Sequence, residues 1–209
     1  MDLPRVLVIT DEGACRSGGV VATIARMLDD VVLGGAVAVV ARRKSQSGVH
    51  SDTAGLCAAL LPICRRAGAL LLAHTDARLV GALGLDGVHL PSTSSPRLAR
   101  LQMPAGRLLG ISRHAGDDLD EGVSDYATLS PVFAPTSKSG DSRPTLGIEA
   151  LRGHRRPVIA LGGIDAGNAT SCLAQGAVGV AVVGAVLGSV NPRRALLSLL
   201  HALEPRQAS

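Results

Sequence analysis

The chain has 209 residues, enough for one large domain that buries most of its apolar surface. It is 46% hydrophobic but only 1% aromatic, so the stacking platforms typical of single-stranded nucleic-acid binding are almost absent. The net charge of +4 is modest and the basic residues are scattered, which favours an anionic small molecule over a nucleic acid as ligand.

The cysteines and the first residues bear on the compartment. The four cysteines have no Cys-x-x-Cys spacing, which predicts reduced core thiols rather than a disulfide frame or a zinc site. The opening residues MDLPRVLVIT have an acid at position two and are not typical of a signal peptide. No apolar run is long enough to span a membrane, so we expect a cytoplasmic protein without a membrane partner.

Short apolar runs alternate with helical patterns along the whole chain. One predicted helix covers 51–68, with Ser51 as its cap and Gly68 at its end, and the last follows Asn191 and Pro192. The predicted strands cover residues 5–10, 36–41, 69–74, 86–90, 108–112, 126–132, 157–162 and 179–185. No linker or charge run divides these eight strands and the eight helices expected between them.

Continuous apolar strands indicate a parallel sheet that helices cover on its outside. Eight such units predict an α/β fold, a (β/α)8 TIM barrel forming a single domain over residues 1–209. An open doubly wound sheet is the alternative, but it would usually need fewer units. In a barrel, the chemistry lies in the loops that follow the carboxyl ends of the strands.

A pair of glycines follows the predicted seventh strand in PVIALGGID, residues 157–165. Loops after strands seven and eight of barrels commonly bind phosphate through backbone N–H groups, so we expect a phosphate against Gly162 and Gly163. The end of the eighth strand supplies the neighbouring Val183 and Gly184. The alternative is that these glycines only permit a turn or tight packing.

Polar residues in other predicted loops suggest further contacts. Arg42 and Lys44 follow the second strand with alternate spacing and can point the same way, towards a second anionic group. Ser137 and Lys138 lie in the longest loop, after strand six, which suggests a lid over an anion. An exposed basic turn and a solvated loop are the respective alternatives.

Three histidines lie in or near the predicted mouth. His114 lies just past strand five, close to Ser112, and is a candidate general acid or base because histidine titrates near neutral pH. His74 ends strand three and is a second candidate. His89 lies inside a predicted strand, where we expect a hydrogen-bonded core residue.

The motifs VLVITD, ARRK, LDGVHLP, GISRHA, DYATLSPVFAPTSK and ALGGIDAGNATSCLAQGAVGVAVVGAV together resemble the thiamin phosphate synthases and their TenI-type relatives, in the same order. The resemblance covers about residues 5–190. It implies a TIM barrel that binds a thiazole phosphate, and a homo-oligomer. The synthases join a pyrimidine diphosphate to a thiazole phosphate with magnesium. The TenI-type tautomerases move a proton on the carboxylated thiazole phosphate without a metal.

The chain departs from the synthase pattern at two carboxylates. His74 and Thr75 stand where synthases have Asn-Asp, with Asp76 one place late. Ser94 stands where synthases have an acid after strand four. Because magnesium prefers carboxylate oxygens, these departures favour a tautomerase without a cofactor. Retained Arg42, Lys44 and Lys138 keep open a synthase that recruits magnesium through Asp76 and the pyrophosphate.

The resemblance therefore implies a thiamin-biosynthesis isomerase, with a synthase or a non-catalytic phosphate-ligand binder as the alternatives. We expect His114 and Lys138 to be catalytic and no residue to bind a metal. The expected substrate-binding residues are Arg42, Lys44, His74, Ser112, Ser137, Gly162, Gly163, Val183 and Gly184.

Overall fold

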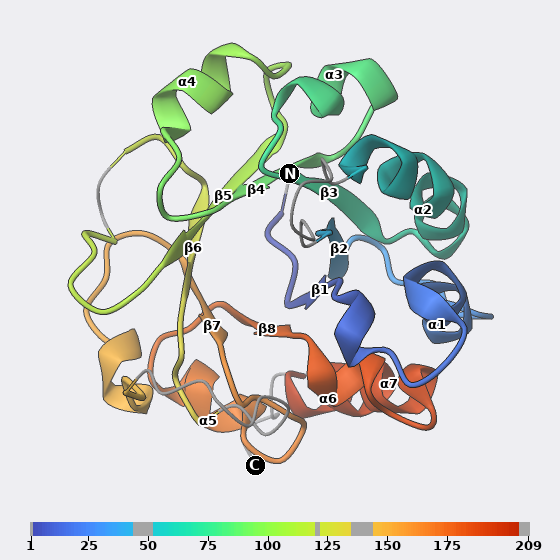
Figure 1. Ribbon diagram of the computed structural model, residues 1–209. Helices are drawn as coiled ribbons and strands as arrows, with labels where there is room; N and C mark the ends of the chain where they lie inside the picture. Colours follow the sequence, from blue (N-terminus) through green and yellow to red (C-terminus); the bar gives the residue numbers. More distant parts are fainter. Residues whose placement is uncertain (1, 44–51, 120–121, 135–143, 205–209) are drawn as a thin grey trace.

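The computed structural model describes residues 2–43, 52–119, 122–134 and 144–204, and they form a closed barrel of parallel strands. The strands pair in sequence order, and β1 closes the barrel against β8 (Figure 1). This confirms the predicted (β/α)8 architecture. The strands are β1 (Val6–Ile9), β2 (Val37–Ala41), β3 (Leu70–His74), β4 (Gly87–Leu90), β5 (Leu108–Arg113), β6 (Tyr126–Leu129), β7 (Val158–Leu161) and β8 (Gly179–Val182).

Helices surround the barrel on its outside (Figure 1). Gly68 ends α2 in the left-handed region as predicted, but the cap is Asp52, whose carboxylate accepts from the Gly55 amide. Within the described ranges, no helix is both long and apolar enough to cross a membrane. The α-helices are α1 (Gly19–Met27), α2 (Thr53–Ala67), α3 (Arg78–Leu83), α4 (Pro96–Leu101), α5 (Ala169–Ala174), α6 (Gly184–Leu187) and α7 (Pro192–Ala202), and the 3-10 helices are η1 (Glu12–Ala14) and η2 (Ile148–Leu151).

Within the residues that the structure describes, the regular alternation of strands and helices fails between β5 and β6. The described residues between β5 and β6 form only turns, and the described part of the β6–β7 connection holds only the short η2. The segment 114–125, HAGDDLDEGVSD, has too few apolar residues to give a helix a buried face. The expectation of a helix between β5 and β6 was therefore wrong.

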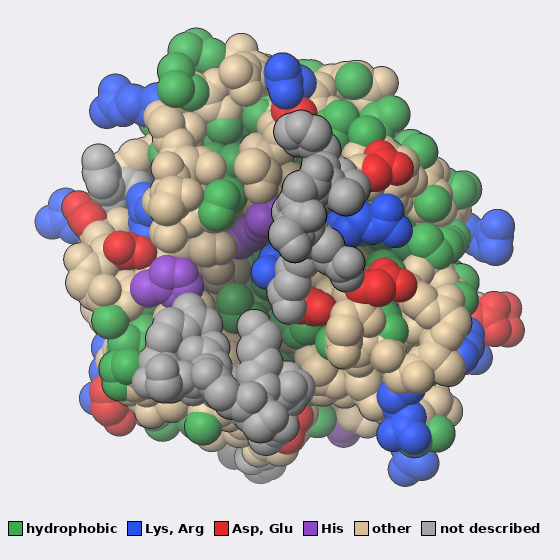
Figure 2. Space-filling model, in the orientation of Figure 1, with side chains coloured by type: hydrophobic (Ala, Val, Ile, Leu, Met, Phe, Trp, Pro, Cys, Tyr) green, Lys and Arg blue, Asp and Glu red, His purple; other side chains and the backbone are tan. Residues whose placement is uncertain are grey.

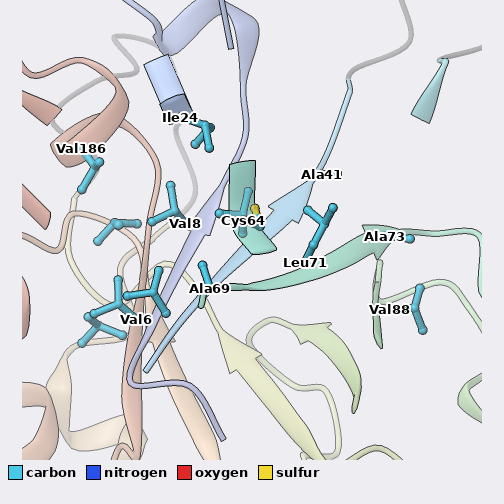
Figure 3. Packing of buried hydrophobic residues seen from close by; sticks show 14 of the residues in the cluster. Val6, Val8, Ile24, Ala41, Cys64, Ala69, Leu71, Ala73, Val88 and Val186 are labelled. Carbon is cyan, nitrogen blue, oxygen red and sulfur yellow. The ribbon is translucent and has the colours of Figure 1, made fainter. Parts of the chain in front are cut away.

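Alternating strand residues divide the core into two layers. The inner layer fills the barrel and consists of Leu7, Ile9, Ala38, Val40, Leu72, Leu108, Tyr126, Ile159 and Ala181. The intervening residues, such as Val6 and Val8, pack outwards against helix residues such as Ile24 and Cys64 (Figure 3). Cys64 forms no disulfide, and its burial raises the pKa of the thiol to about 12, which keeps it protonated.

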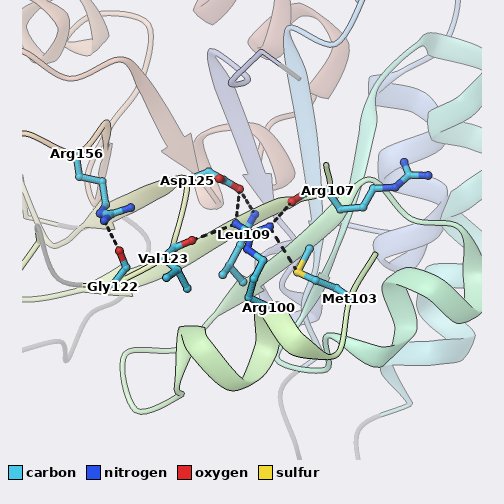
Figure 4. A network of polar contacts seen from close by, with 8 residues as sticks. All are labelled: Arg100, Met103, Arg107, Leu109, Gly122, Val123, Asp125 and Arg156. Atoms are coloured by element: carbon cyan, nitrogen blue, oxygen red, sulfur yellow. Dashed lines mark hydrogen bonds and ion pairs between the residues drawn. The ribbon is translucent and has the colours of Figure 1, made fainter. Parts of the chain in front are cut away.

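Two carboxylates accept hydrogen bonds from backbone amides at the amino-terminal ends of β5 and β3. Asp125 accepts hydrogen bonds from the Leu109 amide at 2.7 Å and from Arg100 at 2.9 Å (Figure 4). Asp86 makes the equivalent contact with the Leu71 amide at 2.9 Å. Each carboxylate thus joins the start of one strand to its neighbour. Because this is the end opposite to the loops that carry chemistry, we assign these contacts to stability.

Candidate active site at the carboxyl ends of the strands

Basic side chains, histidines and loop amides converge at the carboxyl-terminal end of the barrel. Figure 2 shows this face, with histidine and basic side chains recessed near its centre. Arg42 follows β2, His74 ends β3, Ser112 lies near the end of β5 and His114 follows it. The structure therefore brings these four predicted residues to one mouth.

Arg42 is held in place by groups at the end of β1. Its Nη1 lies 3.3 Å from Oδ2 of Asp11, a carboxylate that is only 7% exposed. Its backbone N–H donates to Oγ1 of Thr10 at 2.8 Å, and that hydroxyl donates to the Arg42 carbonyl at 2.7 Å. The guanidinium is partly exposed, so it can meet an anion from the mouth while Asp11 orients it.

His74 is neutral at physiological pH. Burial lowers the pKa of its imidazole to about 4, and the nearby Arg42 cation adds to this effect. Its Nδ1 lies 2.8 Å from the hydroxyl of Thr75. A neutral imidazole beside an arginine suits a hydrogen-bonding role better than a cationic one.

Thr75 adopts a backbone conformation that is unfavourable for a β-branched residue, with φ of 75°. The amide of Asp76 donates to the His74 carbonyl at 3.0 Å, which makes a tight three-residue γ-turn. Such turns store strain of order 1–3 kcal/mol and cluster at functional sites. The strain thus lies at the position where the chain departs from the synthase pattern.

His89 is a buried core residue, as predicted, and it is hydrogen-bonded at both ring nitrogens. Its Nδ1 lies 3.1 Å from the Tyr126 hydroxyl and its Nε2 lies 3.0 Å from Oγ of Ser112. Burial lowers the pKa of His89 to about 3, and His74 contributes further. The ring is therefore neutral and carries one proton.

His114 presents one ring nitrogen to the mouth. Its Nδ1 lies 3.0 Å from the carbonyl oxygen of Ser130 and 3.2 Å from the hydroxyl of the same residue. A carbonyl can only accept, so the shorter contact requires a proton on Nδ1 of the neutral ring, and the hydroxyl then acts as a second acceptor. The His114 amide is tied to the Asp117 carboxylate at 2.8 Å. Nε2 has no hydrogen-bond partner among the described residues, and its lone pair is available to a ligand.

The two glycines after β7 face protein on the side that a Cβ would occupy. A Cβ on Gly162 would lie 2.8 Å from Cα of Pro131, and one on Gly163 would overlap the carbonyl oxygen of Ala134. The loop after β6 packs there, because the Val132 and Phe133 amides donate to the carbonyls of Leu161 and Gly162 at the end of β7. Close packing therefore accounts for the missing side chains, as the alternative interpretation expected, and binding of a phosphate at these glycines stays a prediction.

The amide groups of the same loops remain available for a phosphate. The Gly163 N–H has no partner among the described residues, and the first bond inside α6 runs from Leu187 to Val183. The amides of Gly184 and Ala185 thus have no acceptor within their own helix. Leu161 of β7 pairs with Ala181 of β8, so these two strands are neighbours. The amides that follow them therefore lie at the same end of the barrel.

Two carboxylates near the mouth, Asp76 and Asp11, are engaged by arginines. Asp76 forms a bidentate pair with Arg78, at 3.0 Å and 2.9 Å, and this hydrogen bonding lowers the pKa of Asp76. Asp11 is paired with Arg42. Over the described ranges, no three His, Cys, Asp or Glu side chains lie together as a metal site. These donors do not fit a protein-held magnesium ion, which prefers oxygen ligands free to coordinate.

A cavity of about 530 Å³ lies at the other end of the barrel, lined by residues that include Arg5, Gly35 and Arg65. We place the site at the carboxyl end instead, because the polar groups with available hydrogen-bonding atoms converge there. Lys44, Ser137 and Lys138 lie outside the described residues, so their predicted roles stay predictions.

Sequence reasoning missed three residues that support the site. Asp11 orients Arg42, and Ser130 fixes the tautomer of His114. Asn168 donates to the Gly163 carbonyl at 2.9 Å and accepts from the Asp165 amide at 3.0 Å, which shapes the loop after β7. The sequence did offer one signal for Asp11 and Ser130, because both lie close to the carboxyl end of a predicted strand, where site residues of a barrel are expected.

The chain matches a known protein family and several of its members over most of its length. The sequence model of a family described as "Thiamine monophosphate synthase" matches residues 6–186. A thiamine-phosphate synthase of Chlorobium luteolum is 33% identical to this chain. The matched region covers 98% of this chain and 95% of that relative. Another, of Methanoculleus marisnigri, is 37% identical, with 96% of each chain covered.

The fold has a solved counterpart as well. Thiamine phosphate pyrophosphorylase from Pyrococcus furiosus superposes with a TM-score of 0.71 over 96% of this chain and 95% of its own, at 24% identity. At that identity the likeness supports the fold alone, whereas the family match and the two sequence relatives extend over most of the chain. The protein belongs to the thiamine monophosphate synthase family, the group that the sequence motifs resemble.

Proposed function

We propose that the protein is an enzyme of thiamin biosynthesis that binds a thiazole phosphate, and that its reaction is thiamin phosphate synthesis. The observation that carries this proposal is the likeness, at 33% and 37% identity over nearly the whole chain, to two proteins named thiamine-phosphate synthase. This support outweighs the preference for a tautomerase that the two missing carboxylates suggest. Those carboxylates remain the main departure that the proposal must accommodate.

In the proposed reaction, the bond between the pyrimidine's methylene carbon and the pyrophosphate oxygen breaks. The pyrophosphate leaves with the electron pair, and the thiazole nitrogen forms the new bond to that carbon. Arg42, oriented by Asp11 at 3.3 Å, would hold the leaving pyrophosphate. The amides of Gly163, Gly184 and Ala185 would hold the thiazole phosphate.

Magnesium would neutralise charge on the pyrophosphate if it enters with that substrate. Because Asp76 is bound bidentately by Arg78, the chain offers no matching set of carboxylates to it within the described residues. In our proposal the chain's own cations therefore neutralise more of the pyrophosphate charge. Arg42 is a described cation at the mouth, and Lys44 and Lys138 are its predicted partners.

The TenI-type tautomerase is a second candidate, and the geometry of His114 supports it. With Nδ1 held by the Ser130 carbonyl, Nε2 is the atom that would take a proton from the non-aromatic thiazole phosphate. The same proton would return to another position of that molecule, so the net change is an isomerisation. A general base of this kind contributes about 10²–10⁴-fold to rate.

Two assays on one preparation separate these reactions. The first supplies both synthase substrates with magnesium and quantifies thiamin phosphate. The second follows aromatisation of the carboxylated thiazole phosphate by its ultraviolet change without metal. We expect the first to succeed and Arg42→Gln to reduce it strongly, while the exposed His201→Gln control leaves it unchanged.

The outcomes assign one function each. Metal-free aromatisation that His114→Ala abolishes, without thiamin phosphate formation, would replace the synthase proposal by the tautomerase. Tight binding of thiamin phosphate without either reaction would leave a phosphate-ligand binding protein. Assembly into a homo-oligomer and a cytoplasmic location stay predictions, which sedimentation and fractionation test.

A further inference from the structure

Three side chains form a hydrogen-bonded line through the barrel interior below the mouth. The Tyr126 hydroxyl lies 3.1 Å from Nδ1 of His89, and Nε2 of His89 lies 3.0 Å from Oγ of Ser112. Tyr126 is 0% and His89 1% exposed, whereas Ser112 is half-buried at the mouth. A Cβ on Gly110 would overlap the Tyr126 ring, so this glycine allows the ring to lie across the barrel.

The direction of the first hydrogen bond follows from the burial of Tyr126. Its hydroxyl contacts no hydrogen-bonding group other than His89 within the described part of the chain. If Nδ1 donated to it, the phenol's own proton would be buried without an acceptor, at a cost of about 1–3 kcal/mol. Burial also raises the pKa of Tyr126, so the phenol keeps its proton. Tyr126 therefore donates to Nδ1.

The direction of the second hydrogen bond follows from the first. His89 is neutral, because burial lowers its pKa to about 3, and its single proton must then be on Nε2. Nε2–H donates to Oγ of Ser112, which acts as the acceptor. The hydroxyl proton of Ser112 has no acceptor among the residues that the structure describes, and it is free to point into the mouth.

We infer that His89 is a positioning residue that, together with Tyr126, fixes the Ser112 hydroxyl as a hydrogen-bond donor to an anionic oxygen of the bound substrate. The opposite polarity would make Ser112 donate inwards and present lone pairs to that oxygen. The inference rests on the proposed function only for the identity of the ligand. It gives a role in recognition to a histidine that would otherwise be a core residue.

The polarity is measurable without any ligand. With 15N-labelled histidine, two-bond correlations in an NMR spectrum distinguish the two neutral tautomers of His89. We expect protonated Nε2 and unprotonated Nδ1 in the wild type, and loss of this preference in Tyr126→Phe, whose ring keeps its place over Gly110. A wild-type ring protonated at Nδ1 would overturn the inference, whatever the enzyme's activity.

A double-mutant cycle tests the consequence for binding. Calorimetry with thiamin phosphate should give affinity about 10- to 100-fold weaker for Ser112→Ala, because a donor to a charged group is lost. Tyr126→Phe should weaken binding in the Ser112 background and have no effect in the Ser112→Ala background. Equal effects in both backgrounds would mean that Tyr126 is only structural. That result would contradict the inferred chain of hydrogen bonds from Tyr126 through His89 to Ser112.

The ligand result also separates this inference from the proposed function. If thiamin phosphate does not bind the wild type, the proposed function fails, and the same cycle is run with inorganic pyrophosphate as the probe. Coupling between Tyr126 and Ser112 with that anion would still support the inferred chain of hydrogen bonds, and additive effects would overturn it.

Discussion

Acid should destabilise this protein well above the pH at which carboxylates titrate, because two histidines are buried in neutral form. The pKa of His74 is about 4 and that of His89 about 3, against an ordinary value of 6.5. Each folded-state pKa lies below the unfolded value, so the unfolded chain binds more protons. Stability is therefore complete above pH 6.5 and is lost as the pH falls from there towards the folded-state values.

The magnitude follows from these shifts. At pH 5 the unfolded histidines are mostly charged while the folded ones are mostly neutral, which costs about 2 kcal/mol for each residue. The sum of about 4 kcal/mol is a large part of the roughly 5–15 kcal/mol typical of a domain. Urea unfolding at pH 7.5, 6 and 5 measures the loss directly.

A single variant separates the contribution of one histidine. His74→Asn should remove about half of the decline between pH 7.5 and pH 5, while the exposed His201→Gln should leave the decline unchanged. An unfolding free energy that stays level or rises towards pH 5 would refute the reasoning. So would a His74→Asn decline equal to that of the wild type.

Three further substitutions test local features by unfolding. Gly163→Ala should cost about 2 kcal/mol more than Gly153→Ala, because both glycines have positive φ but only the first would overlap backbone, and equal costs would contradict the packing of the β6 loop. Thr75→Gly should stabilise by about 0.5–1 kcal/mol, since glycine adopts the positive φ of this γ-turn without steric strain, and a loss of stability would contradict the inferred strain. Thr128→Val should stabilise by about 1 kcal/mol, because the Thr128 hydroxyl is buried without a described partner, and a marked loss would show that it has one.

The barrel was predictable because its strands are short, apolar and regularly spaced. Runs such as RVLVIT and GVAVVGA are rich in β-branched residues, and their pattern requires burial on both faces. The missing helix between β5 and β6 was not predicted, since eight units were assumed to be uniform although the segment 114–125 is mainly polar. Position after a strand end correctly brought Arg42 and His114 to one mouth.

The finer features of the site depend on contacts between distant residues. Tyr126 and His89 are 37 positions apart, and no local pattern indicates that they meet across Gly110. The conformation of Gly163 also depends on a loop from another strand, so the sequence showed the glycine but not what it packs against. The pairing of Asp76 with Arg78 is local, and the two-residue spacing of opposite charges was the available signal.

The most direct test of the proposed function is a synthesis assay on the purified wild-type chain with both synthase substrates and magnesium. Thiamin phosphate and pyrophosphate would be quantified in the same reaction. We predict that the two products appear together, in equal amounts and in proportion to the enzyme. Absence of thiamin phosphate under conditions in which a known synthase produces it would contradict the proposed function.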